Sequence, residues 1–295
     1  MSLFKNYLSL IKFTHTIFAL PFALVGFFLG VQSIKMESGG AEIYLAFYLF
    51  SLLLVLLCMI FARSAAMAFN RYLDRHFDAK NPRTVIREIP AGILSANSVL
   101  WFTIIMSALF MFFAFMINTI CFVLSPVALL VILGYSYTKR FTALCHLVLG
   151  LALSLAPIGA YLSMTGYFSP EPLILSFVVL FWVAGFDIIY ALQDESFDKE
   201  HGLKSIPVAL GGKDALGISR FFHLITASLL IVLGVMIEGG LYYKIGEVIF
   251  IGLLIYQHSL VKPNDLRKVN LAFFTTNGIA SIVFGILAII DLITR

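Results

Sequence analysis

The sequence predicts an all-α polytopic membrane protein with about nine transmembrane helices in one bundle. Of its 295 residues, 61% are apolar and only 12% are charged, and the mean hydropathy is +0.99. Soluble globular domains carry roughly 25% charged residues, so this composition excludes them. A single membrane domain is expected over residues 1–295, with related halves near 1–140 and 141–295.

The apolar segments are each long enough to cross a bilayer as a helix. They lie at residues 13–33, 43–69, 97–117, 119–138, 143–163, 172–192, 216–237, 243–261 and 271–293. The third and fourth come from one run, because no Asp, Glu, Lys or Arg occurs from residue 89 to 138. One helix of that length would measure about 75 Å, so the run must turn near Asn118. The sixth and eighth segments contain or adjoin a charged residue, Asp187 and Glu247 respectively.

The basic residues divide unequally between the two ends of these segments. With the N-terminus in the cytoplasm, all of the 20 Lys and Arg residues except Lys35, Lys244 and Arg295 lie at cytoplasmic ends. Short cytoplasmic loops retain positive charge, so this orientation is expected, in a bacterial-type inner membrane with the C-terminus on the opposite side. The net charge of +4 implies lipid headgroups or an anionic substrate and no nucleic acid. No feature indicates an obligatory protein partner.

A charged segment, NRYLDRHFDAKNPRT at residues 70–84, directly follows the second apolar segment. Asp74 and Asp78 are four residues apart and would share one face of a continuing helix, with Asn70 one turn earlier. Like charges at this spacing repel by about 0.2–0.5 kcal/mol, and by more near a low-dielectric membrane. A bound cation is the simplest compensation.

A second segment repeats this arrangement 120 residues later. In YALQDESFDKEHGLKS, residues 190–205, Asp194 and Asp198 are again four apart, and Phe197 corresponds to Phe77. Each copy leaves the cytoplasmic end of an even-numbered span. A single pair of this kind is more often a solvated helix end. The repetition on one side of the membrane favours two halves of one site.

The residue types in the two copies indicate a divalent cation and a diphosphate. Four carboxylates brought together without a metal would force some of them to protonate. Oxygen ligands, with no Cys and no clustered His, favour a hard cation such as Mg²⁺, which also binds phosphate oxygens. The bases interleaved with the aspartates are suited to a diphosphate.

Two charged residues lie deeper in the predicted membrane. Arg63 and Asp187 precede Asn70 and Asp194, respectively, by seven residues, which is two helical turns on the same face. A charge at mid-bilayer costs roughly 2.5–3.5 kcal/mol on insertion scales, so both are expected to be functional.

These motifs resemble those of a known family. RSAAMAFNRYLDRHFDAKNPRT (63–84) and DIIYALQDESFDKEHGLKSIP (187–207) are similar to the two aspartate-rich motifs of the UbiA family of intramembrane aromatic prenyltransferases. YSYTKRFT (135–142) is similar to that family's short loop after its fourth helix. The resemblance covers essentially the whole chain. Arg71 departs from it, because many members have a second acid there, which gives Asn70 more weight.

The resemblance implies Mg²⁺-dependent transfer of a polyprenyl group from polyprenyl diphosphate to an aromatic acid. The implied metal ligands are Asn70, Asp74, Asp78, Asp194 and Asp198. The implied diphosphate-binding residues are Arg63, Lys139, Arg140, Lys204 and Tyr190. The implied acceptor-binding residues are Asp187, Tyr135, Ser136 and Arg140. Asp74, Asp187 and Asp194 are the expected catalytic residues, with Asp187 binding or deprotonating the acceptor's phenol. Tyr135 and Arg140 are also typical of a membrane interface.

The expected acceptor is 4-hydroxybenzoate, in the biosynthesis of a ubiquinone- or menaquinone-type quinone. Prenylation of a naphthoate in menaquinone synthesis is the alternative within the family. An ion-coupled transporter is the alternative from another class. Transporter sites lie near the bilayer midplane, however, whereas both motifs lie at the cytoplasmic edge beside bases suited to phosphate.

Overall fold

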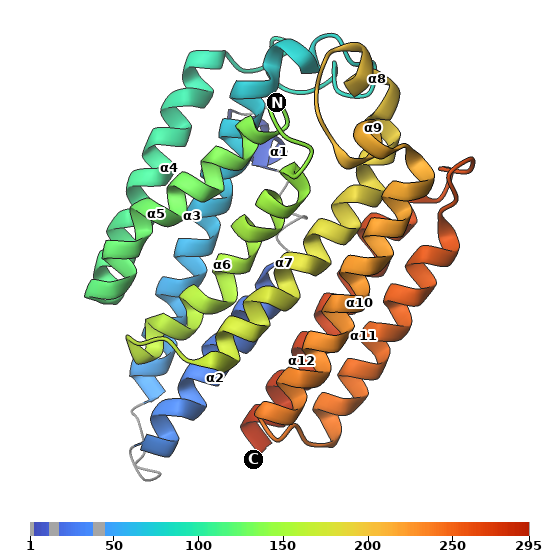
Figure 1. The fold of residues 1–295 in the computed structure, drawn as a ribbon. Coiled ribbons are helices and arrows are strands. Elements are labelled where there is room, and N and C mark those ends of the chain that lie inside the picture. Colours follow the sequence, from blue (N-terminus) through green and yellow to red (C-terminus); the bar gives the residue numbers. More distant parts are fainter. Residues whose placement is uncertain (1–2, 12–17, 38–44, 295) are drawn as a thin grey trace. The chain divides into compact units, whose positions relative to one another are not determined.

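The computed structural model describes residues 3–11, 18–37 and 45–294, and these ranges contain helices joined by turns and loops, without β-strands (Figure 1). The first seven α-helices are α1 Leu3–Ile11, α2 Leu20–Glu37, α3 Leu45–Asp78, α4 Ala96–Ile117, α5 Thr119–Thr138, α6 Cys145–Thr165 and α7 Pro170–Ala191. The remaining elements are the 3-10 helix η2 Leu192–Asp194, α8 Glu195–Glu200, α9 Ile206–Leu210, α10 Gly212–Met236, α11 Leu241–Leu260, the π-helix η3 Leu271–Thr276 and α12 Asn277–Thr294. The predicted all-α class is confirmed.

Among the described residues, 8 helices are long and apolar enough to cross a membrane. The predicted eighth span, 243–261, corresponds to α11, which has 20 residues but is not among the 8. Helix α11 contains the polar residues Lys244, Glu247, Gln257 and His258 among its 20 residues. Its Val248 and Ile255 are nevertheless exposed, as apolar side chains of a lipid-facing helix are. With α11, the described residues agree with the prediction of about nine spans.

The first predicted span begins earlier than the helix that the structure describes. The prediction was 13–33, whereas α2 covers Leu20–Glu37, and residues 12–17 lie outside the described ranges. Pro21 lies in the first turn of α2, where its missing N–H and fixed φ are tolerated. Proline therefore favours a helix start at this position.

The described chain divides into two compact units. Unit 1 comprises residues 1–16 and 49–137, and unit 2 comprises residues 17–48 and 138–295. The predicted halves, 1–140 and 141–295, differ from this division chiefly in the placement of residues 17–48. That the chain forms a single domain stays a prediction.

Unit 2 is built around α7. Helix α6 packs against both α7 and α2, α10 packs against α7, and α12 packs against α11 and α2 (Figure 1). Trp182 of α7 is fully buried between Phe22 and Phe250, with ring centroids 5.1 and 5.6 Å away. Its indole N–H donates to Oδ1 of Asn277 at 2.9 Å, so the polar atom of this large side chain is satisfied.

Two glycines allow the helices of unit 2 to approach closely. A Cβ atom at Gly150 of α6 would lie 2.3 Å from the carbonyl oxygen of Leu180 on α7. A Cβ atom at Gly26 of α2 would lie 2.2 Å from the carbonyl oxygen of Pro157 on α6. Backbone cannot give way as a flexible side chain can, so only glycine fits at these contacts. Small residues serve the same purpose at membrane helix interfaces in general.

Gly150→Ala should destabilise the protein, because the new methyl group forces α6 away from α7. Overpacking of this kind costs about 1–3 kcal/mol. The apparent unfolding temperature of the purified protein in detergent should fall. Gly159→Ala is the matched control on the same helix, since a Cβ atom there meets nothing within 4 Å. Equal unfolding temperatures for the two variants would contradict the close helix contact.

Unit 1 contains α1, most of α3, α4 and α5. Phe61 of α3 stacks on Phe113 of α4 with ring centroids 5.3 Å apart. The sequence analysis did not predict helix α1. Its buried Leu10 packs in a cluster with Ala68 and Val99, while Lys5 is exposed. The helix is amphipathic and has only 9 residues, so it is too short to cross a membrane.

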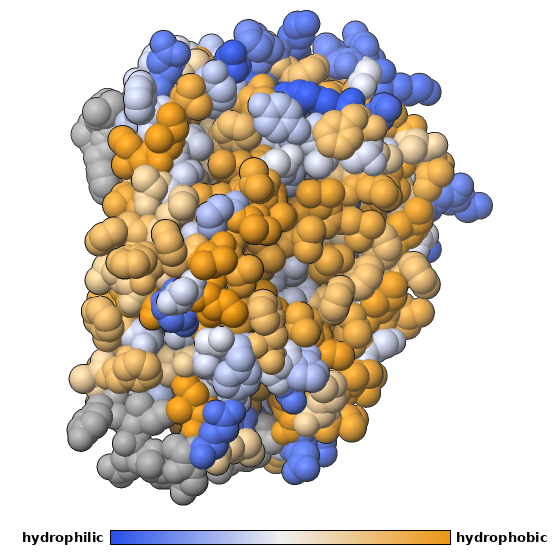
Figure 2. Space-filling view, turned by 60° about the vertical axis from the view of Figure 1, so that its left-hand side comes forward, coloured by the Kyte–Doolittle hydropathy of each residue, from blue (hydrophilic) through white to orange (hydrophobic). Residues whose placement is uncertain are grey.

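The surface of the long helices is apolar. Hydrophobic side chains cover most of the face drawn in Figure 2, and hydrophilic side chains gather toward its ends. Leu130 of α5 and Val235 of α10 are among the most exposed large apolar residues. Such exposure is costly in water and ordinary in lipid, so the distribution is that of an integral membrane protein.

Candidate active site

The first aspartate motif lies on the last turns of α3, which continues as one helix to Asp78. The side-chain amide of Asn70 donates to Oδ2 of Asp74 at 3.0 Å. The same nitrogen lies 3.5 Å from Oγ of Ser136, and Nη1 of Arg71 donates to the side-chain oxygen Oδ1 of Asn70 at 3.4 Å. Asn70 therefore connects the first aspartate to Ser136, and the predicted common face of Asn70, Asp74 and Asp78 is formed.

Asp78, the second aspartate of this motif, is buried and paired with a base. Nη1 of Arg87 lies 2.6 Å from its Oδ1, whereas its Oδ2 is buried without a hydrogen-bond partner. The hydroxyl of Thr84 donates to the backbone carbonyl of Asp78 at 3.2 Å. The loop after α3 thus folds back onto the end of the helix.

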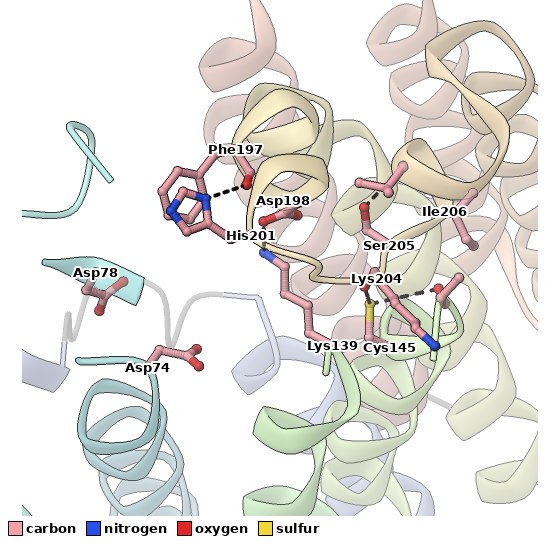
Figure 3. Close-up of polar contacts among 12 residues, drawn as sticks. Asp74, Asp78, Lys139, Cys145, Phe197, Asp198, His201, Lys204, Ser205 and Ile206 are labelled. Carbon is pink, nitrogen blue, oxygen red and sulfur yellow. Dashed lines mark hydrogen bonds and ion pairs between the residues drawn. The ribbon is translucent and has the colours of Figure 1, made fainter. Parts of the chain in front are cut away.

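The second motif is in unit 2, where the helix is interrupted. Helix α7 ends at Ala191, the 3-10 turn η2 ends at Asp194, and α8 then carries Asp198. Nζ of Lys139 lies 2.8 Å from Oδ1 of the fully buried Asp198. Figure 3 shows the Lys139 side chain extending toward this carboxylate. Oδ1 of Asp198 is thus engaged by Lys139, whereas its Oδ2 is buried without a hydrogen-bond partner. The tighter turn changes the predicted geometry, because Asp187 and Asp194 are not on one continuous α-helix.

The two motifs share a pattern of burial as well as of sequence. In each, the first aspartate, Asp74 or Asp194, is partly buried, and the second, Asp78 or Asp198, is buried. In each, the second aspartate forms an ion pair with a base. The structure therefore supports the interpretation of two related copies.

The bases predicted for diphosphate differ in their surroundings. Lys139 faces Asp198, whereas the exposed Lys204 side chain points away from it in Figure 3. The backbone N–H of Lys204 donates to the carbonyl of Lys139 at 2.7 Å, and Sγ of Cys145 lies 3.6 Å from the Lys204 carbonyl oxygen. Arg140 is partly buried in the turn that follows α5. These contacts hold the Lys204 segment against the start of α6.

In unit 1, Arg63 lies two turns before Asn70 on α3, and its Nε is buried without a hydrogen-bond partner. Ser136 is buried near the end of α5, and Tyr135 beside it is partly buried. A buried guanidinium nitrogen without a partner is costly unless an anion binds nearby. This fits the predicted role of Arg63.

Asp187, which lies near the end of α7, is paired with a histidine that the sequence analysis did not single out. Nδ1 of His146, on the first turn of α6, lies 2.7 Å from Oδ2 of Asp187. The His146 side chain is 3% exposed and that of Asp187 is 22% exposed. The Asp187 oxygen Oδ1 makes no hydrogen bond that the described residues provide. One face of this carboxylate is therefore accessible.

Aromatic residues flank Asp187 along α7, Phe186 directly before it and Tyr190 three residues after it. Tyr190 stacks on Phe273 with ring centroids 4.2 Å apart, and Phe186 meets Phe273 edge-on at 5.3 Å. Phe18 completes the group, 5.6 Å from Phe273. Aromatic faces of this kind stabilise a nearby cation.

The sequence analysis missed Arg87 and His146. Arg87 lies nine residues after Asp78 and belonged to the basic residues explained by membrane orientation. His146 is a single histidine at the start of an apolar segment, 41 residues from Asp187. No group of three or more His, Cys, Asp or Glu side chains that could hold a metal occurs in the described ranges. Each unit supplies an acidic pair, so one ion shared by both pairs stays a prediction.

Comparison with known proteins gives a consistent result. The family model of the UbiA prenyltransferase family matches residues 19–279. A 4-hydroxybenzoate octaprenyltransferase of Nitrosomonas europaea is 31% identical over 234 residues, which are 79% of this chain and 80% of the relative. Its counterpart in Vibrio cholerae is 32% identical over 237 residues, 80% of this chain and 83% of the relative.

Solved structures are similar over nearly the whole chain. The apo structure of a UbiA homolog from Aeropyrum pernix has a TM-score of 0.82 and 30% identity, covering 94% of this chain and 98% of that chain. A UbiA homolog from Archaeoglobus fulgidus, bound to DMAPP and Mg²⁺, has a TM-score of 0.74 and 23% identity, covering 98% of this chain and 100% of that chain. The second likeness is one of fold.

Proposed function

The chain belongs to the UbiA prenyltransferase family, and we propose that it transfers a polyprenyl group from polyprenyl diphosphate to the ring of 4-hydroxybenzoate. The observation that carries this proposal is the repeated acidic pair. Each copy has a buried aspartate ion-paired with a base, Asp78 with Arg87 and Asp198 with Lys139. Acids for a metal ion beside bases for a phosphate are what ionisation of an allylic diphosphate requires. The relatives named 4-hydroxybenzoate octaprenyltransferases support the acceptor.

The donor atoms fit Mg²⁺. Asp78 Oδ2 and Asp198 Oδ2 are buried and lack hydrogen-bond partners, while the other oxygen of each carboxylate faces a base. A hard cation satisfies such oxygens well. The residues that would hold it are Asn70, Asp74, Asp78, Asp194 and Asp198. Bound there, Mg²⁺ would act as a Lewis acid on the leaving diphosphate.

For the diphosphate we propose Arg63, Lys139, Arg140, Lys204 and Tyr190. The unpartnered Nε of Arg63 and the position of Lys139 beside Asp198 support the first two. Lys204 would have to turn from its exposed position. We also propose that the ring of Tyr190, which stacks on Phe273, helps to stabilise the allylic cation.

For the acceptor we propose Asp187, Tyr135, Ser136 and Arg140. Asp187 would accept the phenolic proton through Oδ1 while the ring attacks the allylic carbon. The carbon–oxygen bond to the diphosphate breaks and a carbon–carbon bond to the ring forms. The attacked ring carbon then loses its proton and the phenol is restored, so that in sum the prenyl group replaces one ring hydrogen. Arg140 would bind the acceptor carboxylate, as guanidinium groups do.

The membrane setting is consistent with this reaction. The chain is an integral membrane protein, and its relatives from bacteria support an inner-membrane location. We propose that the N-terminus and both aspartate motifs face the cytoplasm, because nearly all Lys and Arg residues lie at that end of the spans. The product would enter quinone biosynthesis.

Membranes containing the protein should prenylate 4-hydroxybenzoate when supplied with Mg²⁺ and a labelled polyprenyl diphosphate. A panel that includes a dihydroxynaphthoate, with product separated by chromatography, measures the preference directly. Omission of Mg²⁺, by addition of a chelator, should abolish the product because the diphosphate would leave without charge compensation. If only the naphthoate were prenylated, it and not 4-hydroxybenzoate would be the acceptor. If no acceptor were prenylated, the proposed reaction would be wrong.

A further inference from the structure

The imidazole of His146 joins Asp187 to the segment that follows α8. Its Nδ1 lies 2.7 Å from Asp187 Oδ2, and its Nε2 accepts the backbone N–H of Ile206 at 3.3 Å. We propose that His146 is a positioning residue that holds Asp187 in its ionised form for the acceptor phenol, acting as a neutral imidazole. This inference rests on the proposed prenyl transfer.

The hydrogen bonds fix the tautomer. The backbone N–H of Ile206 can only donate, so Nε2 of His146 must present its lone pair. The ring proton is then on Nδ1, where it is donated to Asp187. An imidazolium would place a second N–H at Nε2, directed at the N–H of Ile206 in a buried contact. Two facing donors without an acceptor are unfavourable.

A neutral partner suits a general base better than a charged one. An imidazolium would cancel the charge of Asp187 and reduce its attraction for a proton. The neutral donor stabilises the carboxylate by one hydrogen bond, fixes Oδ2, and leaves Oδ1 for the phenol. Because Asp187 is 22% exposed while His146 is 3% exposed, the donor lies on the protein side of the carboxylate.

The fold fixes His146 from several directions. Gly150, one turn along α6, brings that helix against the Leu180 carbonyl of α7, the helix that carries Asp187. Cys145, next to His146, contacts the Lys204 carbonyl, and the Lys204 N–H bonds the Lys139 carbonyl. The acceptor base and the chain segment between Asp198 and Ile206 are thus connected through one buried ring.

The test compares two substitutions of His146 in the full-length protein in membranes. Glutamine retains one donor and one acceptor but cannot carry a positive charge, whereas leucine retains neither. His146→Leu should lower kcat/KM for the acceptor by about 10²-fold, with an unchanged KM for polyprenyl diphosphate. His146→Gln should recover most of this loss.

The control is Ser163→Ala on the same helix, whose buried hydroxyl bonds only the carbonyl of Ala160 within α6. It should behave as the wild type. Unchanged acceptor kinetics in His146→Leu would overturn the inference, and so would a higher KM for the diphosphate alone. No transfer by the wild-type protein to any acceptor would instead refute the proposed function, and the inference with it.

A spectroscopic measurement checks the protonation state without turnover. With ¹⁵N-labelled histidine in lipid bilayers, the His146 signals are assigned by their absence from His146→Gln. We expect one protonated nitrogen, Nδ1, and an unprotonated Nε2. A spectrum with both nitrogens protonated would overturn the neutral tautomer, even if the variants lost activity.

Discussion

Asp74→Ala and Asp194→Ala should each lower prenyl transfer by about 10³-fold or more, with any acceptor, because a preorganised charge that stabilises the leaving group is lost. Each variant removes the first, more accessible aspartate of one motif. Both acidic pairs are required if they hold Mg²⁺ together, so either loss alone should be enough. The measurement is transfer of a labelled prenyl group in membranes at saturating Mg²⁺.

Glu200→Ala is the matched control, since this exposed acid lies on α8 with Asp198 but has no assigned role. Its rate should be near that of the wild type, which separates a ligand effect from a general loss of negative charge. Asp194→Asn keeps one oxygen donor and should regain part of its rate as Mg²⁺ is raised. A near-normal rate in Asp74→Ala or Asp194→Ala would refute the metal assignment.

The two acidic pairs could be predicted from the sequence because their geometry is local. A spacing of four residues places two side chains on one helical face whatever the rest of the fold does. The repeat after 120 residues then carried the prediction that Asp78 and Asp198 are equivalent, and their common burial and ion pairing agree with it. The apolar runs predicted the long helices for the same reason, since a bilayer sets their length.

The partners of these aspartates could not be predicted, because they depend on tertiary contacts. Lys139 reaches Asp198 across 59 positions of sequence, and His146 reaches Asp187 across 41. The positive-inside rule accounted for Lys139 and Arg87 without distinguishing them from basic residues that only anchor the loops. His146 lies beside an apolar run and gave no signal of a partner.

The interruption of the helix after α7 could not be predicted from the sequence either. The 3-10 turn at Leu192–Asp194 separates Asp187 from the second motif, yet nothing in the sequence distinguishes it from the uninterrupted end of α3. The turn has no Pro or Gly to mark it. Helix α8 packs against α9, and α9 packs against α10 and α7; these contacts favour the turn and follow only from the assembled bundle.

Asp187→Asn should lower transfer by about 10²–10⁴-fold, the range for loss of a general base, while leaving polyprenyl diphosphate binding intact. The substitution is nearly isosteric. Its amide oxygen can still accept the Nδ1 proton of His146, so the contact between α6 and α7 is retained while the negative charge is removed. An amide cannot take the phenolic proton.

The measurement is kcat and KM for each substrate separately, together with diphosphate binding at equilibrium. Because Asp187 is placed among the acceptor residues and not among the proposed metal ligands, the Mg²⁺ requirement should not change in Asp187→Asn. A large rise in that requirement would instead make Asp187 part of the metal site. Normal transfer would remove it from the acceptor site and leave its hydrogen bond with His146 as a purely structural link between α6 and α7.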